Sequence, residues 1–240
     1  MLLSFFLLTL LLGCENDNRA NYESLNTSNS SINSSTSIKE SSKFKTQFPN
    51  TEFSNIITLD SVNKDGTLRA QTNTDFGELI VVANGKEEVG HLNAPSVAGL
   101  EGDLTFQGNY TVINIIDGKK HEVMQLKELT FIQQSDRVVN FDKVSFNDAD
   151  VYFLTPQYTS GHGLNAYAIA VNKSNGEAIS LKFIKNDTTT DTLNYANDQL
   201  PVNENDFLKV APGISAGTSE ENADITFYKL DLTNKYFIAE

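Results

Sequence analysis

The chain has 240 residues, with 18 basic and 31 acidic side chains and a formal net charge of −13. This acidic balance argues against a nucleic-acid partner, because contacts to the phosphate backbone need clustered Lys and Arg. It also argues against electrostatic attachment to anionic lipid. A single cysteine excludes an internal disulfide, and fifteen Phe and eight Tyr with no Trp favour strands over helices.

The chain opens on an apolar run from Leu2 to Leu12, followed by its only cysteine. The run matches the core of a signal peptide in length and falls short of the roughly 20 residues that a membrane span needs. The stretch Leu11-Leu12-Gly13-Cys14 resembles a bacterial lipobox, where a signal peptide is cut before a cysteine that then carries lipid. The resemblance implies a signal peptide over residues 1–13 and acyl chains such as palmitate on Cys14. The alternative is a free thiol after a hydrophobic start.

The same resemblance implies an extracytoplasmic protein attached to the cell membrane through the lipid on Cys14. No Lys or Arg precedes the apolar run, so we expect either that translation begins upstream or that the signal is weak. The residue after the cysteine is Glu15 and not the aspartate of the common inner-membrane retention signal. The outer membrane is therefore open to the protein in a Gram-negative host, and a Gram-positive surface fits equally well.

Residues 14–50 contain the cysteine and a segment in which Ser and Asn dominate, as in residues 29–37 (NSSINSSTS). Isolated apolar residues cannot bury enough surface to offset the entropy of ordering the chain. We therefore expect a disordered tether behind the lipidated cysteine.

Residues 51–240 have the texture of one all-β domain. Short runs of β-branched and aromatic residues alternate with Asn, Asp and Gly, and no long 3.6-residue apolar stripe is present. Turn signals between apolar runs predict four hairpins, because type I′ turns need positive φ at both central residues. The predicted turns are Asn84-Gly85, Asp117-Gly118, Asn175-Gly176 and Thr233-Asn234.

Each predicted hairpin is preceded by a polar turn and further candidate strands. The polar turns are Asn63–Gly66, Glu101–Asp103, Asn147–Asp150 and Asn203–Asp206. A unit of four short strands that recurs every 40 to 50 residues or so is typical of a propeller blade. The domain thus resembles a bacterial propeller-like repeat protein, and we expect an array of about four short antiparallel blades. The alternative is an antiparallel β-sandwich, in which turns also recur at short intervals.

In the blade interpretation, the loops between the second and third strands share one face, and two of them are long: Thr155–Asn165 and Ala211–Ala223. Long loops on a rigid β scaffold often carry binding residues. Tyr158, Ser160 and His162 are the predicted ligand contacts, because they combine an aromatic ring, a hydroxyl and an imidazole. The alternative is a solvated connection without a partner.

No motif commits the chain to a chemistry. No nucleophile elbow, zinc spacing or phosphate loop is present, and the acidic turn with Asp148 and Asp150 is explained by solvation as well as by calcium. We predict no catalytic residue, no metal and no cofactor. The predicted function is a membrane-anchored, non-enzymatic binding or interaction module for a protein, peptide or glycan. An envelope hydrolase that uses His162 and a structural or stress-related envelope lipoprotein are the alternatives.

Overall fold

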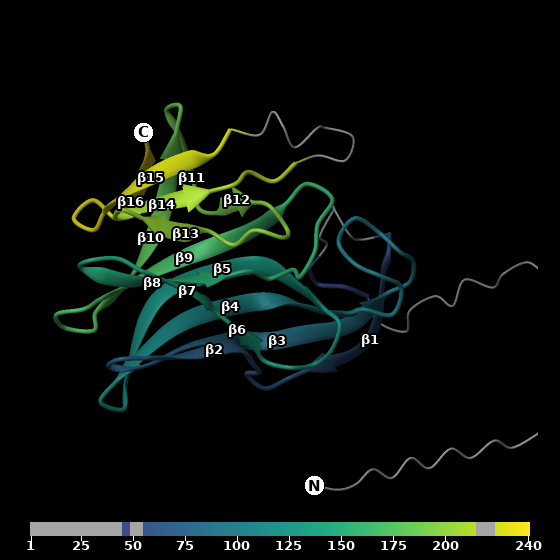
Figure 1. Ribbon diagram of the computed structural model, residues 1–240. Helices are drawn as coiled ribbons and strands as arrows, with labels where there is room; N and C mark the ends of the chain where they lie inside the picture. Colours follow the sequence, from purple (N-terminus) through teal and green to yellow (C-terminus); the bar gives the residue numbers. More distant parts are fainter. Residues whose placement is uncertain (1–44, 49–54, 215–223) are drawn as a thin grey trace, which may run out of the picture. The chain divides into compact units, whose positions relative to one another are not determined.

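The computed structural model describes residues 45–48, 55–214 and 224–240, which form sixteen β-strands and no helix (Figure 1). The all-β prediction is confirmed for this part of the chain. The predicted signal peptide, Cys14 and most of the predicted tether lie outside the described residues. The strands form two sheets, one of six strands and one of ten.

The six-stranded sheet takes the first strands of the domain, drawn from blue to teal in Figure 1. Its order is β5-β4-β3-β2-β6, and β1 pairs with the same edge of β3 as β2 does, farther along that strand. The pairings are antiparallel except for β2 with β6. The strands are β1 (Ile57–Asn63), β2 (Leu68–Thr74), β3 (Gly77–Leu92), β4 (Leu104–Ile116), β5 (Lys119–Gln133) and β6 (Val139–Asn140).

The dipeptide Asn84-Gly85 lies inside β3, so the hairpin predicted there is wrong. Gly85 has a φ of +94°, and the register of β3 against β4 shifts between Ala83 and Glu87. The positive φ that suggested a type I′ turn instead accommodates a β-bulge, which bends one long strand without reversing it. The same bulge separates the part of β3 that pairs with β2 from the part that pairs with β1.

A buried carboxylate follows the bulge. Glu87 is fully buried and accepts hydrogen bonds from Arg69 Nε at 3.0 Å and Arg69 Nη2 at 2.7 Å. Asn63 Nδ2 at 3.0 Å and the Tyr110 hydroxyl at 2.9 Å complete its partners. The guanidinium of Arg69 also lies 3.6 Å from the centroid of the Phe106 ring. The charge of Glu87 is thus paired and hydrogen-bonded, as burial requires.

The ten-stranded sheet follows one continuous path, β13-β14-β15-β16-β10-β9-β8-β7, with β11 added to β10 and β12 added to β9. Its pairings are antiparallel except for β10 with β16. The strands are β7 (Asp142–Ser145), β8 (Ala149–Leu154), β9 (Leu164–Asn172), β10 (Ala178–Lys185), β11 (Thr188–Thr190), β12 (Leu193–Tyr195), β13 (Val202–Glu204), β14 (Phe207–Val210), β15 (Thr226–Asp231) and β16 (Tyr236–Ala239).

The two ends of this path meet, so the sheet is nearly closed into an eight-stranded barrel. Side chains bridge β7 and β13: Asn203 Nδ2 donates to the Ser145 carbonyl at 2.6 Å. Close by, the Asn147 N–H donates to Asp206 Oδ1 at 2.9 Å. We call this junction the seam.

A barrel of this kind replaces the predicted propeller, which is wrong. Blades need independent four-stranded sheets around an axis, whereas here one sheet runs from β13 to β7 without a break. Residues 107–109, where the blade interpretation also needs a short loop between strands, lie within β4. The β-sandwich alternative matches the structure only in that the six-stranded sheet packs against β8 and β9 of the ten-stranded sheet.

Three of the four predicted hairpins are present. Asp117 and Gly118 join β4 to β5 with φ values of 50° and 72°, as a type I′ turn requires. Gly176, with φ 74°, lies in the turn between β9 and β10. The β15–β16 hairpin is also present, although its positive φ falls on Lys235.

Two apolar cores share the strands β8 and β9. Val151, Phe153 and Ala168 belong to the core inside the barrel, whereas Tyr152 and Ile169 pack against the six-stranded sheet. All six residues of β8 are buried because each face of the strand meets a core. This explains the unbroken apolar run Val151–Leu154, which would be out of place on a strand with one wet face.

Residues 45–48, which we call the strap, lie at the end of the predicted tether and contact the six-stranded sheet. Thr46 Oγ1 and the Gln47 N–H each donate to the Glu88 carboxylate at 2.6 Å. Glu88 is only 3% exposed. A short piece of chain is thereby fastened to a central strand of the sheet.

Candidate functional site

The strands β9 and β10 separate at one end of the barrel. They pair with each other only as far as Ala168 and Leu181. Beyond that point β11 pairs with β10 and β12 pairs with β9. The turn before β11 has positive φ at both Asn186 and Asp187, the signature of a type I′ hairpin. The chain from 188 to 195 thus borders a hollow of about 420 Å³, which we call the mouth cavity.

The deep lining of the mouth cavity is apolar and belongs to the barrel core. Phe183, Leu193 and Tyr228 line it, and each is at least 94% buried. The rings of Phe183 and Tyr228 meet edge to face with centroids 5.9 Å apart. Burial raises the pKa of the Tyr228 hydroxyl, so Tyr228 is neutral at physiological pH. These side chains give the cavity a rigid apolar floor.

The rim of the mouth cavity is polar. Asn165, Asn186, Thr188 and Thr192 contribute amide and hydroxyl groups to its lining. Lys185 lies two residues beyond Phe183 on β10 and therefore points to the same face of the strand. Its Nζ donates to Thr226 Oγ1 on β15 at 2.9 Å. An apolar floor with a few polar groups around it, in the mouth of a barrel, is the usual form of a small-molecule site.

The predicted contact Tyr158 lies in the β8–β9 loop and is not among the residues that line the mouth cavity. Its hydroxyl donates to Asp103 Oδ2 at 2.6 Å, which ties the loop to residues 96–103. Burial and then the Asp103 carboxylate raise the pKa of Tyr158. The side chain is 37% exposed. Tyr158 therefore has a clear structural contact, and its role in ligand binding stays a prediction.

The predicted contacts Ser160 and His162 lie directly behind the rim. Ser160 exchanges two backbone hydrogen bonds with the Asn197 side chain, at 3.2 and 2.6 Å. Asn194, which lines the cavity, donates to the His162 carbonyl at 3.2 Å and accepts from the Gly213 N–H at 3.1 Å. The β8–β9 loop thus supports a cavity wall, although the ligand contacts predicted for Ser160 and His162 stay predictions.

Glycine is required where this loop meets its neighbours. Gly163 has a φ of +84°, and a Cβ on it would lie 2.4 Å from Gly213 Cα and 2.5 Å from the Tyr195 carbonyl oxygen. No side chain fits such spacing without displacement of backbone. The two glycines therefore allow the loop to approach the chain segment beside the cavity.

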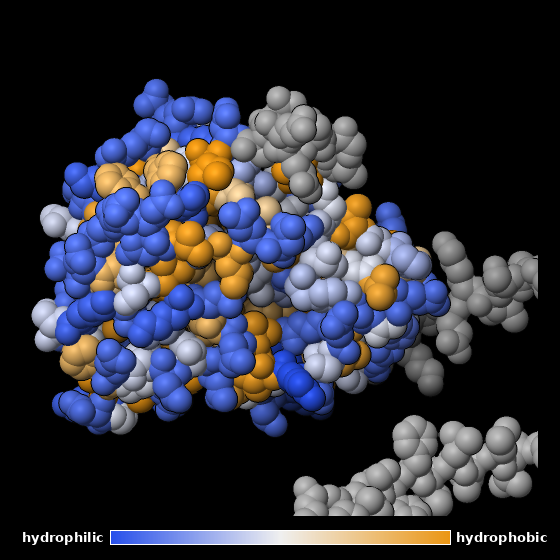
Figure 2. All heavy atoms as spheres, in the orientation of Figure 1, coloured by the Kyte–Doolittle hydropathy of each residue, from blue (hydrophilic) through white to orange (hydrophobic). Residues whose placement is uncertain are grey.

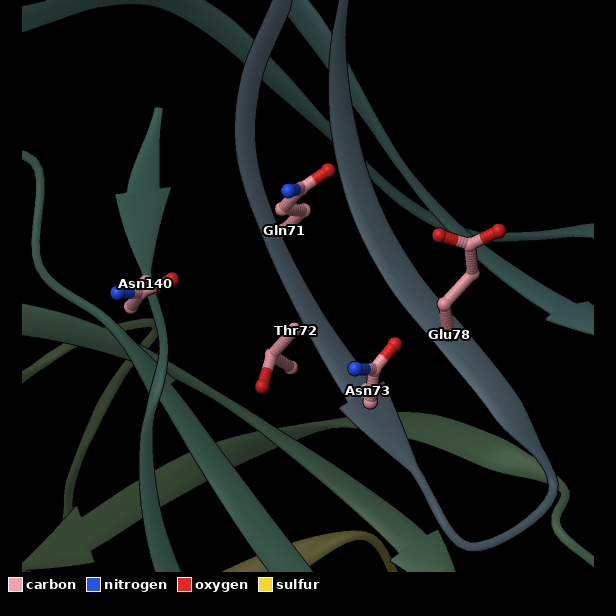
Figure 3. A pocket seen from close by; sticks show the side chains of 5 residues that line it. All are labelled: Gln71, Thr72, Asn73, Glu78 and Asn140. Atoms are coloured by element: carbon pink, nitrogen blue, oxygen red, sulfur yellow. The ribbon is translucent and has the colours of Figure 1, made fainter. Parts of the chain in front are cut away.

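A second hollow, of about 220 Å³, lies on the solvent-facing side of β2 (Figure 3). Gln71 and Asn73 share one face of β2, Glu78 lies opposite Asn73 on β3, and Asn140 lies opposite Gln71 on β6. Figure 3 shows these side chains around the hollow, and all the residues that line it are polar. It is smaller than the mouth cavity and lined by polar residues only, so it is the weaker candidate.

The acidic turn considered for calcium is occupied by lysines. The Asp150 carboxylate lies within salt-bridge distance of Lys143 and, at 3.3 Å, of Lys173, and it also accepts from Ser145. Burial alone would raise the pKa of Asp150, but the hydrogen bonds from Lys143 and Ser145 and the two lysine charges lower it overall. Within the described ranges, no cluster of three or more His, Cys, Asp or Glu residues could hold a metal ion.

Sequence reasoning missed the residues that border the mouth cavity. The run from Asp187 to Asp191 reads as a loop, yet Thr188–Thr190 forms a strand. A signal was present, since three β-branched residues follow a polar turn after the apolar run of β10. The separation of β9 and β10, which creates the cavity, depends on long-range pairing that no local pattern reports.

The exposed surface and the comparisons with known proteins indicate no particular function. On the face drawn in Figure 2, apolar patches are interspersed with hydrophilic side chains. Over the residues described, no helix is long and apolar enough to cross a membrane. Comparisons with protein-family models, with curated proteins and with solved structures find no match. We therefore infer a function from the fold and the mouth cavity.

Proposed function

We propose that the chain is a lipid-anchored extracytoplasmic protein that binds a small ligand without chemical conversion. The observation that carries the proposal is the mouth cavity, with its apolar floor and its polar rim. Its volume of about 420 Å³ lies in the range of small-molecule sites. The lipobox resemblance at Leu11–Cys14 supplies the location.

A hydrolase that uses His162 is the alternative. A serine nucleophile needs an imidazole within hydrogen-bond reach as its base. The Ser160 hydroxyl accepts from the backbone N–H of His162 at 3.2 Å and keeps its own proton to donate. The mouth cavity, and not this loop, motivates our proposal of binding without catalysis.

Binding is tested by thermal shift of the full-length protein against glycans, short peptides and small metabolites. We expect a ligand to raise the Tm of wild type, since binding to the native state alone stabilises it. Thr192→Phe, which places a ring in the mouth cavity, should abolish the shift. Asn73→Phe, which places a ring in the second hollow, should leave the shift intact. An unchanged shift in Thr192→Phe with a lost shift in Asn73→Phe would move the site to the second hollow.

The anchor is tested by expression of the full-length chain in a bacterial host with labelled palmitate. Because Cys14 is the only cysteine, any thioether-linked label reports on that residue. Cys14→Ala should lose the label, stay unprocessed and leave the membrane fraction. Ser4→Ala, in the same leader, is the control and should behave as wild type. Membrane attachment and processing of Cys14→Ala equal to wild type would refute the anchor.

A further inference from the structure

We propose that the mouth cavity selects a small hydroxylated ligand with one carboxylate, such as a sugar acid, and that Lys185 is its counter-ion. This inference rests on the proposed function, because it names the ligand class of the same site. The residues that carry it lie on β10, β11 and β15, in the turn between β10 and β11, and between β11 and β12.

The charge of the lining is the first argument. Lys185 is the only Lys, Arg, Asp or Glu among the described residues that line the mouth cavity. The whole chain carries a net charge of −13, so a lining without a carboxylate among the described residues stands apart from the rest of the protein. A cationic ligand would meet the exposed Lys185 ammonium at the rim, where like charges repel.

The partner of Lys185 is the second argument. Nζ donates to the neutral hydroxyl of Thr226 at 2.9 Å, and no carboxylate of the described residues forms a salt bridge with it. An ammonium has three N–H donors, so two remain for a ligand or solvent. By contrast, Lys182 on the other face of β10 pairs with Asp191 at 2.8 Å. A single ammonium balances a single negative charge, which favours a carboxylate over a phosphate dianion.

The neutral lining is the third argument. Thr188 and Thr192 each present a hydroxyl, which can donate and accept, and Asn186 presents an amide with both functions. Such groups match the hydroxyls of a small sugar-like molecule. The apolar floor of Phe183 and Tyr228 suits the C–H face of a ring and excludes water beneath it.

The test compares D-glucuronate with D-glucose, which are close in size and differ in the carboxylate. Titration calorimetry with the full-length protein at low salt should show glucuronate binding at least tenfold more tightly than glucose. Lys185→Gln should remove that preference. Lys182→Gln, a lysine three residues away on the same strand, should keep it. The Tm of both variants reports that they fold.

The outcomes separate this inference from the proposed function. Equal binding of the two sugars, or a preference that survives in Lys185→Gln, overturns the ligand class and leaves a binding site in place. No binding of either sugar also overturns the ligand class. The proposed function fails as well only if the wider thermal-shift screen produces no stabilising ligand.

Discussion

Glu87 shows how a single residue holds together two irregular features of the six-stranded sheet. Its carboxylate accepts hydrogen bonds from Nε and Nη2 of Arg69 and from the side chain of Asn63, the last residue of β1. The bulge in β3 and the break between β1 and β2 are therefore connected through one buried charge. Burial and the neighbouring Glu87 charge raise the pKa of Tyr110, which keeps that hydroxyl a donor. Removal of one partner of such a buried pair is costly, because it leaves the other charge uncompensated.

Glu87→Gln should lower the free energy of unfolding by about 3 kcal/mol or more, because it leaves the buried Arg69 guanidinium without a counter-charge. Urea denaturation measures the loss. The double variant Glu87→Gln/Arg69→Met removes both charges and should recover part of it. Glu78→Gln, on the solvent-facing side of the same strand, is the control and should change little. Equal losses in the single and double variants would show that the pair is not coupled.

At the scale of elements, the two Gly-containing dipeptides of the sheet show what the sequence could predict. Asp117-Gly118 and Asn84-Gly85 carry the same local signal, a polar residue and a glycine between apolar runs. One closes a hairpin and the other bends β3. Both satisfy the same requirement for positive φ, so the local sequence predicts the backbone angle and leaves the direction of the chain undetermined. Pairing across the sheet decides between them.

Gly85→Ala should lower the free energy of unfolding by about 1 to 2 kcal/mol, measured by chemical denaturation. The cost comes from the backbone, since φ is +94° and a Cβ there would meet nothing within 4 Å. Lys86→Ala, at the exposed neighbouring position, is the matched control. Unchanged stability of Gly85→Ala would mean that the bulge does not depend on the glycine.

Predictability ends where distant elements meet. Alternation and turn residues were enough for the all-β class and for the β4–β5, β9–β10 and β15–β16 hairpins. The parallel pairing of β10 with β16 joins residues such as Phe183 and Phe237, and no local pattern encodes it. Lys185, which follows this paired segment on β10, lines the mouth cavity. The sequence therefore does not predict the candidate site for the same reason that it does not predict the barrel: both depend on pairing between distant strands.

For the molecule as a whole, the seam is the place where the barrel wall depends on side chains. Between β7 and β13 the connection includes the Asn203 amide and the Asp206 carboxylate, each bonded to the backbone of the neighbouring segment. Every other step along the path from β13 to β7 is a backbone ladder. Segments held by few hydrogen bonds open locally at low free energy, so we expect the barrel to open first at the seam.

Asn203→Ala should raise the hydrogen-exchange rates of amides in β13 and β14 and leave those of β3 and β4 unchanged. The variant loses two hydrogen bonds of the Asn203 side chain, one to the Ser145 carbonyl and one from the Asp206 N–H, at about 1 kcal/mol each. Hydrogen exchange of the full-length protein, followed by mass spectrometry, measures these rates. Asn73→Ala, at an exposed position of β2, is the control. Uniform acceleration across both sheets would show that the seam is not an independent opening unit.

The strap at residues 45–48 has a mechanical consequence. If Cys14 is held in a membrane, tension enters the domain from the N-terminal side of Lys45. It is then borne first by the two hydrogen bonds on Glu88, in the middle of β3. Because β3 is paired on both edges, a pull at Glu88 loads several strands at once and does not peel β1 from the edge. Under that condition, the strap would transfer tension to the paired strands of the sheet before it reaches β1.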